Sequence, residues 1–436
     1  MEHDSGLSIL FIIRIDEEFF KNSDIVLDKK REFNSQYVAA WAGPSNVIPS
    51  HTTSDISRQR KSIGDMLSSC RLDLEGNDTP KTIGERIYNS LGLSQFFDQL
   101  ITFFEKGIIS RDLLIITNET LFPWEWAFTQ WPNEEYDDMF LSEIFNCSTS
   151  LIGQIDASFL SSLAIQLSPK LRYSLDPFES DYIIISNDND GELSCVCDEK
   201  EFLQKHIESQ GINSACIHTF EANEPQCDLN LRRYFKSNDI RRVQLIHVAG
   251  HMKQGGMRVG LGNLDASEVE QMMTVGQLRA TSLVVLNCCN SGQVIDHYRL
   301  SENRNTQISL IESFLRAGAE TVLVTFLPIS DQCAFNFVQC FYEKIFSRDE
   351  SGLLRSVSIA DALRETRLEW REKRGGDSTG CAYVLFGSPN ARLFTEAERR
   401  MSVAKESRQI VRHSLDGFEQ VKRKAQERGI KEDTSK

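Results

Sequence analysis

The 436-residue sequence has no apolar run of the ~20 residues that a membrane-spanning helix needs. The apolar segment Leu7 to Ile15 is too short, is interrupted by Arg14 and is followed by Asp16. It also lacks the basic leader and the small-residue cleavage site of a signal peptide. We therefore expect a buried strand here, no membrane contact and a cytoplasmic protein.

Patterns for disulfides, metals and nucleotides are missing as well. The 11 cysteines are scattered along a long chain, which favours reduced thiols over a disulfide scaffold. Cys195 and Cys197 form C-x-C without a second pair for zinc, and Cys197 falls where an EF-hand loop around Gly191 would need glutamate. No G-x-x-x-x-G-K-[ST] motif occurs, and no usable G-x-G-x-x-G follows a strand. The sequence predicts no metal and no cofactor.

Positive charge is scarce except at the C-terminus. With 63 acidic and 48 basic residues, the net charge is −15, which argues against bound nucleic acid because phosphate affinity comes mainly from Lys and Arg. Residues 396–436 differ, with 11 basic and 8 acidic side chains. We expect a charged helical tail there, either solvated or docked on an acidic partner or on the body of the protein.

The first part of the chain is mixed in pattern, and no internal repeat of 20–50 residues is present. We expect strands at 7–15 and 113–117, a polar irregular stretch to about Pro80 and a helix over 82–106. Residues 168–181 are typical of a linker. The predicted domains are therefore an N-terminal subdomain (1–170), a catalytic domain (171–395) and the tail (396–436).

After the linker, short apolar strands alternate with amphipathic helices. The strands are expected at 182–185, 215–219, 243–248, 283–288, 320–326 and 382–386. The helices are expected at 199–210, 229–236, 310–317, 332–346 and 359–369. This alternation predicts an α/β fold, a mostly parallel sheet covered by helices on both faces. Active sites of such sheets lie at the carboxyl ends of the strands.

Two of these strands end in reactive side chains. Leu245-Ile-His-Val-Ala-Gly-His251 places a histidine just past one strand, and Leu283-Val-Val-Leu-Asn-Cys-Cys289 places a cysteine just past the next. A cysteine nucleophile needs a nearby imidazole to take its proton or to hold the thiolate. Each residue alone would be read as a buried core group, but together they predict a catalytic pair.

Each member of the pair has a neighbouring competitor. His247 lies inside its strand and is expected to face a helix. Cys288 is the last strand residue and is expected to point into the core, because successive strand residues face opposite sides. We therefore assign the catalytic roles to His251 and Cys289.

The two blocks resemble those of CHAT domains, the caspase-like cysteine peptidases related to caspases and separase. Family members typically show His-Phe-Ala-x-His-Gly and Leu-Ser-Ala-Cys-x-Thr-Gly. Further blocks match in order: Leu114 to Glu125, which contains Pro-Trp-Glu; Val322 to Asp331; Ala362-Leu-Arg364; and Ala382 to Pro389. The resemblance covers about residues 110–394 and implies a caspase-like fold. It also implies that residues 1–170 form the pseudo-caspase-like half of a larger CHAT domain.

The resemblance implies a His-Cys dyad with an oxyanion hole made by the backbone N–H groups of Met252 and Cys289. Met252 replaces the family's glycine, and Leu327 replaces a usual tryptophan at the specificity pocket. Separase-like members bind Arg or Lys through an acidic pocket, for which Asp331, Asp188 and Asp190 are the candidates. Asp331 has an alternative role as the N-cap of the helix that follows it.

The polar stretch 295–307 falls where caspases are cut during maturation, so Arg299 and Arg304 are candidate self-cleavage positions or parts of a surface loop. The resemblance implies an endopeptidase in bacterial defence or programmed cell death. Such an enzyme cuts a protein partner, for example a pore-forming or effector protein, after a separate activator or sensor switches it on. Two alternatives stay open: a catalytically silent interaction module, and another cysteine enzyme on the same kind of sheet, such as an acyltransferase.

Overall fold

The structure is a computed structural model of the whole chain. It divides into two compact units. Unit 1 comprises Met1–Leu67, Lys81–Lys170 and Glu398–Lys436, and unit 2 comprises Ser68–Pro80 and Leu171–Ala397. The structure describes residues 7–15, 36–42, 50–53, 57–69, 79–117, 123–129, 138–151, 180–188, 193–224, 226–253, 256–259, 262–273, 276–289, 306–327, 329–348, 350, 354–373 and 378–394.

Unit 1 is an α/β subdomain built on a sheet in the order β7-β4-β1-β2-β3. The pairs β1–β4 and β4–β7 are parallel, whereas β1–β2 and β2–β3 are antiparallel. The central strands are buried, as expected for strands that are covered by side chains on both faces. The strands are β1 (Ser8–Ile15), β2 (Gln36–Ala42), β3 (Ser50–Thr52), β4 (Asp112–Thr117) and β7 (Asn146–Leu151).

The remaining elements of unit 1 are mostly short. A 3-10 turn at Trp124–Trp126 follows β4, and the indole N–H of Trp124 donates to Thr117 Oγ1 at 3.0 Å. This bond and the full burial of Trp126 hold the Pro-Trp-Glu segment in place after β4. The other elements are α2 (Ser57–Ser69), α3 (Thr79–Ser90), α4 (Ser94–Glu105), α5 (Leu141–Ile144) and the hairpin of β5 (Phe128–Thr129) with β6 (Met139–Phe140).

Two predictions for unit 1 are wrong. The expected single helix over 82–106 is two helices, α3 and α4, because Gly92 adopts a φ of +71° between them. A positive φ ends a right-handed helix, and glycine adopts it at little cost. The polar stretch before Pro80 is also less irregular than expected, since it contains β2, β3 and α2.

Unit 2 contains a ladder in the order β9-β8-β10-β13-β14-β15. All neighbours are parallel except β14 and β15, which are antiparallel. Every residue of β8, β14 and β15 is buried, which explains their near-continuous apolar sequence. The strands are β8 (Asp181–Ser186), β9 (Ile217–Glu221), β10 (Val243–Lys253), β13 (Leu283–Cys289), β14 (Thr321–Thr325) and β15 (Tyr383–Gly387).

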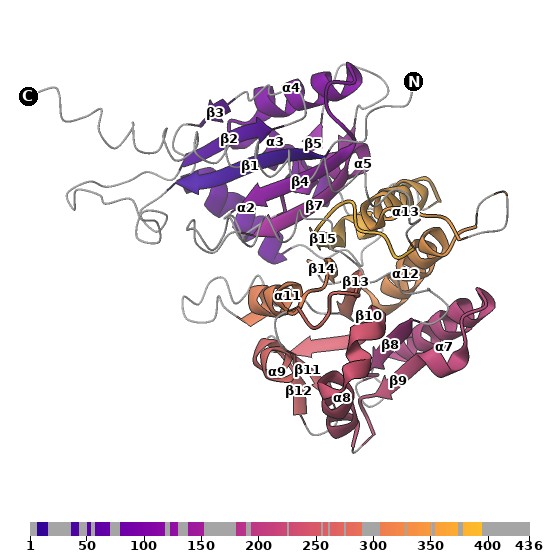
Figure 1. Cartoon of the computed structure of the whole chain (residues 1–436). Helices are drawn as coiled ribbons and strands as arrows, with labels where there is room; N and C mark the ends of the chain where they lie inside the picture. The colour runs from indigo at the N-terminus through magenta and orange to yellow at the C-terminus, as the bar shows by residue number, and fades with distance from the viewer. Residues whose placement is uncertain are drawn as a thin grey trace, which may run out of the picture. The chain divides into compact units, whose positions relative to one another are not determined.

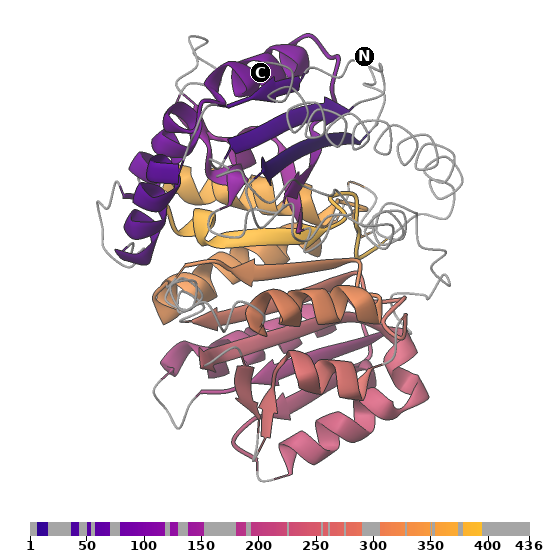
Figure 2. The ribbon, with the colours of Figure 1, turned by 90° about the vertical axis from the view of Figure 1, so that its left-hand side faces the viewer.

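Helices cover both faces of this ladder, as predicted (Figures 1 and 2). One face carries α7 (Ser194–Ser209), α12 (Asp331–Ile345) and α13 (Ile359–Lys373). The other face carries α8 (Cys227–Lys236), α9 (Ala266–Met272) and α11 (Thr306–Ala317), which lie in front of the sheet in Figure 2. Buried residues of α12 recur every three or four positions, as in an amphipathic helix: Ala334, Phe337, Val338, Phe341, Tyr342 and Ile345.

Strand β10 is longer than the sequence predicts. It pairs with β8 as far as Ala249 and with β11 (Gly256–Val259) from Met252 onward. A further strand, β12 (Gly262–Leu264), pairs with β11 in an antiparallel hairpin. The segment after β10 therefore contains a hairpin, and residue 251 lies within the strand rather than just past it.

None of the helices in the described ranges is long and apolar enough to cross a membrane. The predicted tail, 396–436, lies outside the described residues.

Candidate active site

The carboxyl ends of β10 and β13 carry the two predicted catalytic positions. The parallel register between these strands runs from Leu245 opposite Leu283 to His251 opposite Cys289. The two backbone positions are therefore partners at the last rung of the ladder, with Cys289 as the last residue of β13. The side chains of His251, Met252 and Cys289 lie outside the described part of the structure.

Gly250 precedes the histidine at the point where β10 changes its neighbour. Its φ is +155°, and a Cβ built on it would lie 2.9 Å from the carbonyl oxygen of Asn187 and 3.0 Å from Met257 Sδ. The backbone N–H of Asn187 donates to the carbonyl oxygen of Ala249 at 2.9 Å, so the end of β8 is held close to β10 here. Only glycine fits this close approach without displacing a neighbour.

Substitution Gly250→Ala is expected to lower the free energy of unfolding by ~1–3 kcal/mol and to reduce kcat/KM by ~10-fold or more, because it moves the backbone at residue 251. Thermal unfolding and peptide cleavage by the folded protein measure the two effects. Gly211→Ala is the matched control, since Gly211 also has a positive φ, +89°, but follows the far end of α7. An unchanged kcat/KM in folded Gly250→Ala protein would contradict this account.

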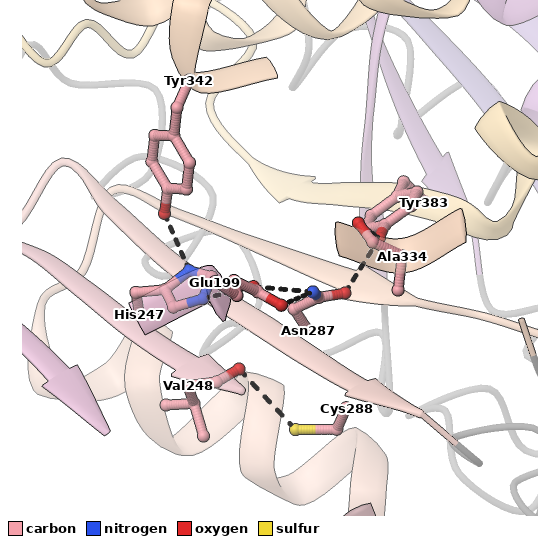
Figure 3. A network of polar contacts seen from close by, with 8 residues as sticks. All are labelled: Glu199, His247, Val248, Asn287, Cys288, Ala334, Tyr342 and Tyr383. Carbon is pink, nitrogen blue, oxygen red and sulfur yellow. Dashed lines mark hydrogen bonds and ion pairs between the residues drawn. The ribbon is translucent and has the colours of Figure 1, made fainter. Parts of the chain in front are cut away.

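His247 is a core residue, not a rival for the catalytic role. Its side chain is fully buried. Its Nε2 lies 2.7 Å from Glu199 Oε1 in α7, and its Nδ1 lies 2.9 Å from the hydroxyl of Tyr342 in α12 (Figure 3). The expectation that it faces a helix is confirmed, and both ring nitrogens are already engaged.

Cys288 is likewise a core residue. It is fully buried, and its thiol lies 3.9 Å from the carbonyl oxygen of Val248. Figure 3 shows Cys288 and Val248 on the opposite side of the strands from His247 and Asn287. The expected inward orientation is confirmed.

Asp331 is the first residue of α12, just beyond the end of β14. Its Oδ2 accepts a hydrogen bond of 2.7 Å from the backbone N–H of Cys195, in the first turn of α7. N–H groups in a first turn lack intrahelical partners and favour a carboxylate. The N-cap of α12 is Ser330, whose hydroxyl accepts from the N–H of Cys333, so the alternative role of Asp331 as that cap is wrong.

The Cys195 thiol beside Asp331 is not an activated nucleophile. Burial raises its pKa, and the negative charge of Asp331 raises it further, although a hydrogen bond with Ser194 acts in the opposite direction. A raised pKa lowers the thiolate fraction at neutral pH.

The other acidic candidates follow β8. Asp188 is half-buried and accepts a hydrogen bond from the side-chain amide of Asn223, and its carbonyl oxygen accepts from the N–H of Leu193 at 3.0 Å. Asp190, Arg299 and Arg304 lie outside the described residues. Among the specificity candidates, the structure thus gives surroundings for Asp331 and Asp188 alone.

Several buried polar residues close in space to the strands of the predicted dyad were not identified from the sequence. Glu199, Asn287, Tyr342 and Tyr383 form a buried hydrogen-bonded network with His247 (Figure 3). The sequence signal that could have revealed them is one polar residue inside each of two apolar strands, His247 in β10 and Asn287 in β13. A buried polar side chain needs hydrogen-bond partners, so each of these residues implies further polar groups in the core.

The parallel ladder with helices on both faces and one closing antiparallel strand is the predicted α/β fold, and it agrees with the caspase-like fold that the resemblance implies. Residues 203–409 match the model of the CHAT domain family. This match confirms, for residues 203–409, the resemblance to CHAT domains that the motifs indicate.

The solved structures that are similar to this chain include three at 10–17% sequence identity. The crystal structure of the Arg-specific cysteine proteinase gingipain R (RgpB) has a TM-score of 0.48 and 10% identity, covering 77% of this chain and 76% of that one. The complex of the Porphyromonas gingivalis RgpB pro- and mature domains has a TM-score of 0.48 and 11% identity, with coverages of 78% and 79%. The Saccharomyces cerevisiae separase–securin complex has a TM-score of 0.41 and 17% identity, covering 85% of this chain but 22% of that one. No curated protein sequence matches the chain.

Proposed function

We propose that the protein is a cysteine endopeptidase with His251 and Cys289 as its catalytic dyad. The observation that carries the proposal is the register between β10 and β13, in which these two positions are partners at the carboxyl end of the ladder. Carboxyl ends of parallel strands are where α/β sheets carry their active sites. The buried competitors His247 and Cys288 strengthen the assignment, because each has another role in the core.

The proposed reaction begins with His251 taking the proton of the Cys289 thiol. The thiolate attacks the peptide carbonyl, and the N–H groups of Met252 and Cys289 stabilise the oxyanion. His251 then protonates the leaving amine, and water hydrolyses the thioester with His251 as the general base. Residue 252 needs only its backbone N–H for this role, so methionine in place of the family's glycine is compatible with it.

We further propose that the enzyme cleaves after Arg or Lys and that Asp331 provides most of this preference. Asp331 Oδ2 is anchored by the N–H of Cys195. The side chain is partly exposed and follows β14, which neighbours β13 in the ladder. An anchored carboxylate that is open to one side suits a cationic side chain. Asp188 and Asp190 are secondary candidates.

The wider role is proposed from the family alone. In this proposal the protein is a cytoplasmic enzyme of bacterial defence or programmed cell death. Its substrate is a pore-forming or effector protein, and its activator is a separate sensor. Self-cleavage at Arg299 or Arg304 belongs to the same proposal. The competing function is a silent interaction module, which Met252 at the position of the family's glycine leaves open.

Fluorogenic peptides with Arg, Lys, Asp or Leu before the scissile bond test the proposal. We expect wild-type protein to cleave the Arg and Lys peptides and to be labelled by a peptide carrying a thiol-reactive group. Labelling at Cys289 without cleavage would indicate a latent enzyme that needs its activator. Absence of both, in folded protein, would reject catalysis in favour of the interaction module. Cleavage after Asp would reject the proposed pocket.

A further inference from the structure

We propose that Glu199, His247 and Asn287 form a positioning network that holds the carboxyl ends of β10 and β13 at the spacing which the dyad needs. The inference rests on the proposed function and deepens it. It concerns residues that do not touch the reacting atoms but lie close to them along the chain. His247 lies four residues before His251 on β10, and Asn287 lies two residues before Cys289 on β13.

One carboxylate joins the two strands. Glu199, in α7, is 2% exposed, and its Oε1 lies 2.7 Å from Nε2 of His247. The side-chain amide nitrogen of Asn287 donates to Oε1 at 2.8 Å and to Oε2 at 2.9 Å. Glu199, from α7, therefore contacts both β10 and β13 (Figure 3).

Two tyrosines complete the network. The hydroxyl of Tyr383, in β15, donates to Asn287 Oδ1 at 2.8 Å. The hydroxyl oxygen of Tyr342 lies 2.9 Å from His247 Nδ1. Burial raises the pKa of this phenol well above its usual value, and the nearby Glu199 raises it further. Tyr342 therefore keeps its proton. If it donates that proton to Nδ1, Nε2–H of His247 donates to Glu199, and every group in the network has its partner.

Such a network is a costly way to fill a core. Strand residues on the same face as the network, such as Leu245 and Val285, are apolar and fully buried. Replacing a buried polar cluster with well-packed apolar groups is often neutral or stabilising. Stability alone therefore does not account for the network, whereas directional hydrogen bonds fix the distance and register of two strands more narrowly than apolar packing does.

The first turn of α7, the helix that carries Glu199, also contacts the candidate site. Leu193 and Val196 pack with Ala249, which lies two residues before His251 and opposite Asn287 in the register. The N–H of Cys195 binds Asp331, the proposed specificity residue. Helix α7 thus connects both strands of the dyad with the proposed binding carboxylate, and Glu199 is its polar connection to the strands.

Glu199→Gln and the double variant Glu199→Gln/Asn287→Asp test the inference. In Glu199→Gln, one oxygen becomes an NH₂ group that faces the amide of Asn287, so a donor meets a donor. In the double variant, the carboxylate introduced at position 287 accepts from that NH₂ group and still accepts from Tyr383, which restores the network. Hydrogen exchange at residues 249–252 and 287–289 reports on the strand ends, and kcat and KM report on the site.

We expect Glu199→Gln to accelerate exchange at both strand ends by ~10-fold and to lower kcat by ~10- to 100-fold with KM within ~3-fold. The double variant should recover most of both losses. The matched control is Glu369→Gln, which removes a carboxylate bound by Lys344 and Lys373 on α12 and α13 and should change neither quantity.

Unchanged exchange at the strand ends in folded Glu199→Gln would overturn the inference, as would a loss of kcat that the double variant does not repair. If folded wild-type protein neither cleaves a peptide nor is labelled at Cys289, the proposed function fails, while the exchange comparison still decides whether the network holds the strand ends. Should Glu199→Gln not fold, Tyr383→Phe removes one bond to Asn287 and gives the same comparison with a smaller expected effect.

Discussion

Replacing Cys289 by alanine is expected to reduce peptide cleavage by about 10³-fold or more, because it removes the nucleophile and leaves only binding and oxyanion stabilisation. The loss should appear in kcat and should be accompanied by loss of labelling with a thiol-reactive peptide. The unfolding temperature should change little, since residue 289 is the last position of β13. Cleavage of a fluorogenic Arg peptide, with protein concentration matched by absorbance, measures the effect.

Cys288→Ala is the matched control for this experiment. The neighbouring thiol is fully buried and contacts the carbonyl oxygen of Val248, so its loss is expected to cost about 1 kcal/mol of stability. Cleavage by the folded control should remain within a few-fold of wild type. Full activity of Cys289→Ala, or a comparable loss in folded Cys288→Ala, would reject Cys289 as the nucleophile.

Asp331→Asn is expected to lower kcat/KM for Arg and Lys peptides by about 10²-fold, because the bound cation loses its charge partner. The substitution preserves shape, and its amide oxygen still accepts from the N–H of Cys195, so α7 keeps this contact. Reactivity of Cys289 toward a small alkylating agent should be unchanged. Comparing kcat/KM for matched Arg and norleucine peptides separates a loss of charge recognition from a general loss of catalytic activity.

Asp188→Asn provides the comparison, since Asp188 is partly exposed and is already bonded to Asn223. Its effect on the Arg peptide should be less than ~10-fold if Asp331 makes the main contact. An equal loss on Arg and norleucine peptides in Asp331→Asn would mean that Asp331 acts only through the first turn of α7. A larger loss in Asp188→Asn would move the pocket to the end of β8.

Most strands of unit 2 could be predicted from sequence because they are apolar runs with polar or glycine-containing flanks, although β9 is not such a run. Six expected strands occur within a few residues of their predicted bounds, as β8 and β14 illustrate. The extension of β10 could not be predicted, since residues 250–253 form a strand through their pairing with β13 and β11. The break at Gly92 was readable in principle, but an apolar helical pattern continues on both sides of it.

Only part of the candidate site could be predicted from the sequence, for a related reason. His251 and Cys289 stand at strand ends, where a local pattern is enough to single them out. The partners of Glu199 are 48 and 88 residues away along the chain, and no local spacing encodes such contacts. The sequence pattern predicts a helix that begins at Glu199, although α7 begins five residues earlier at Ser194.

The contact between Asp331 and the first turn of α7 has a consequence for protein engineering. A library that varies position 331 to change the preferred substrate also varies the capping of the helix that carries Glu199. Side chains without an acceptor would leave the N–H of Cys195 without that partner and loosen the helix start. Selection for new specificity would therefore enrich Asn, Ser or Glu at this position for reasons unrelated to the substrate. Randomising position 195 together with position 331, with proline included at 195, separates the two demands because proline has no N–H to satisfy.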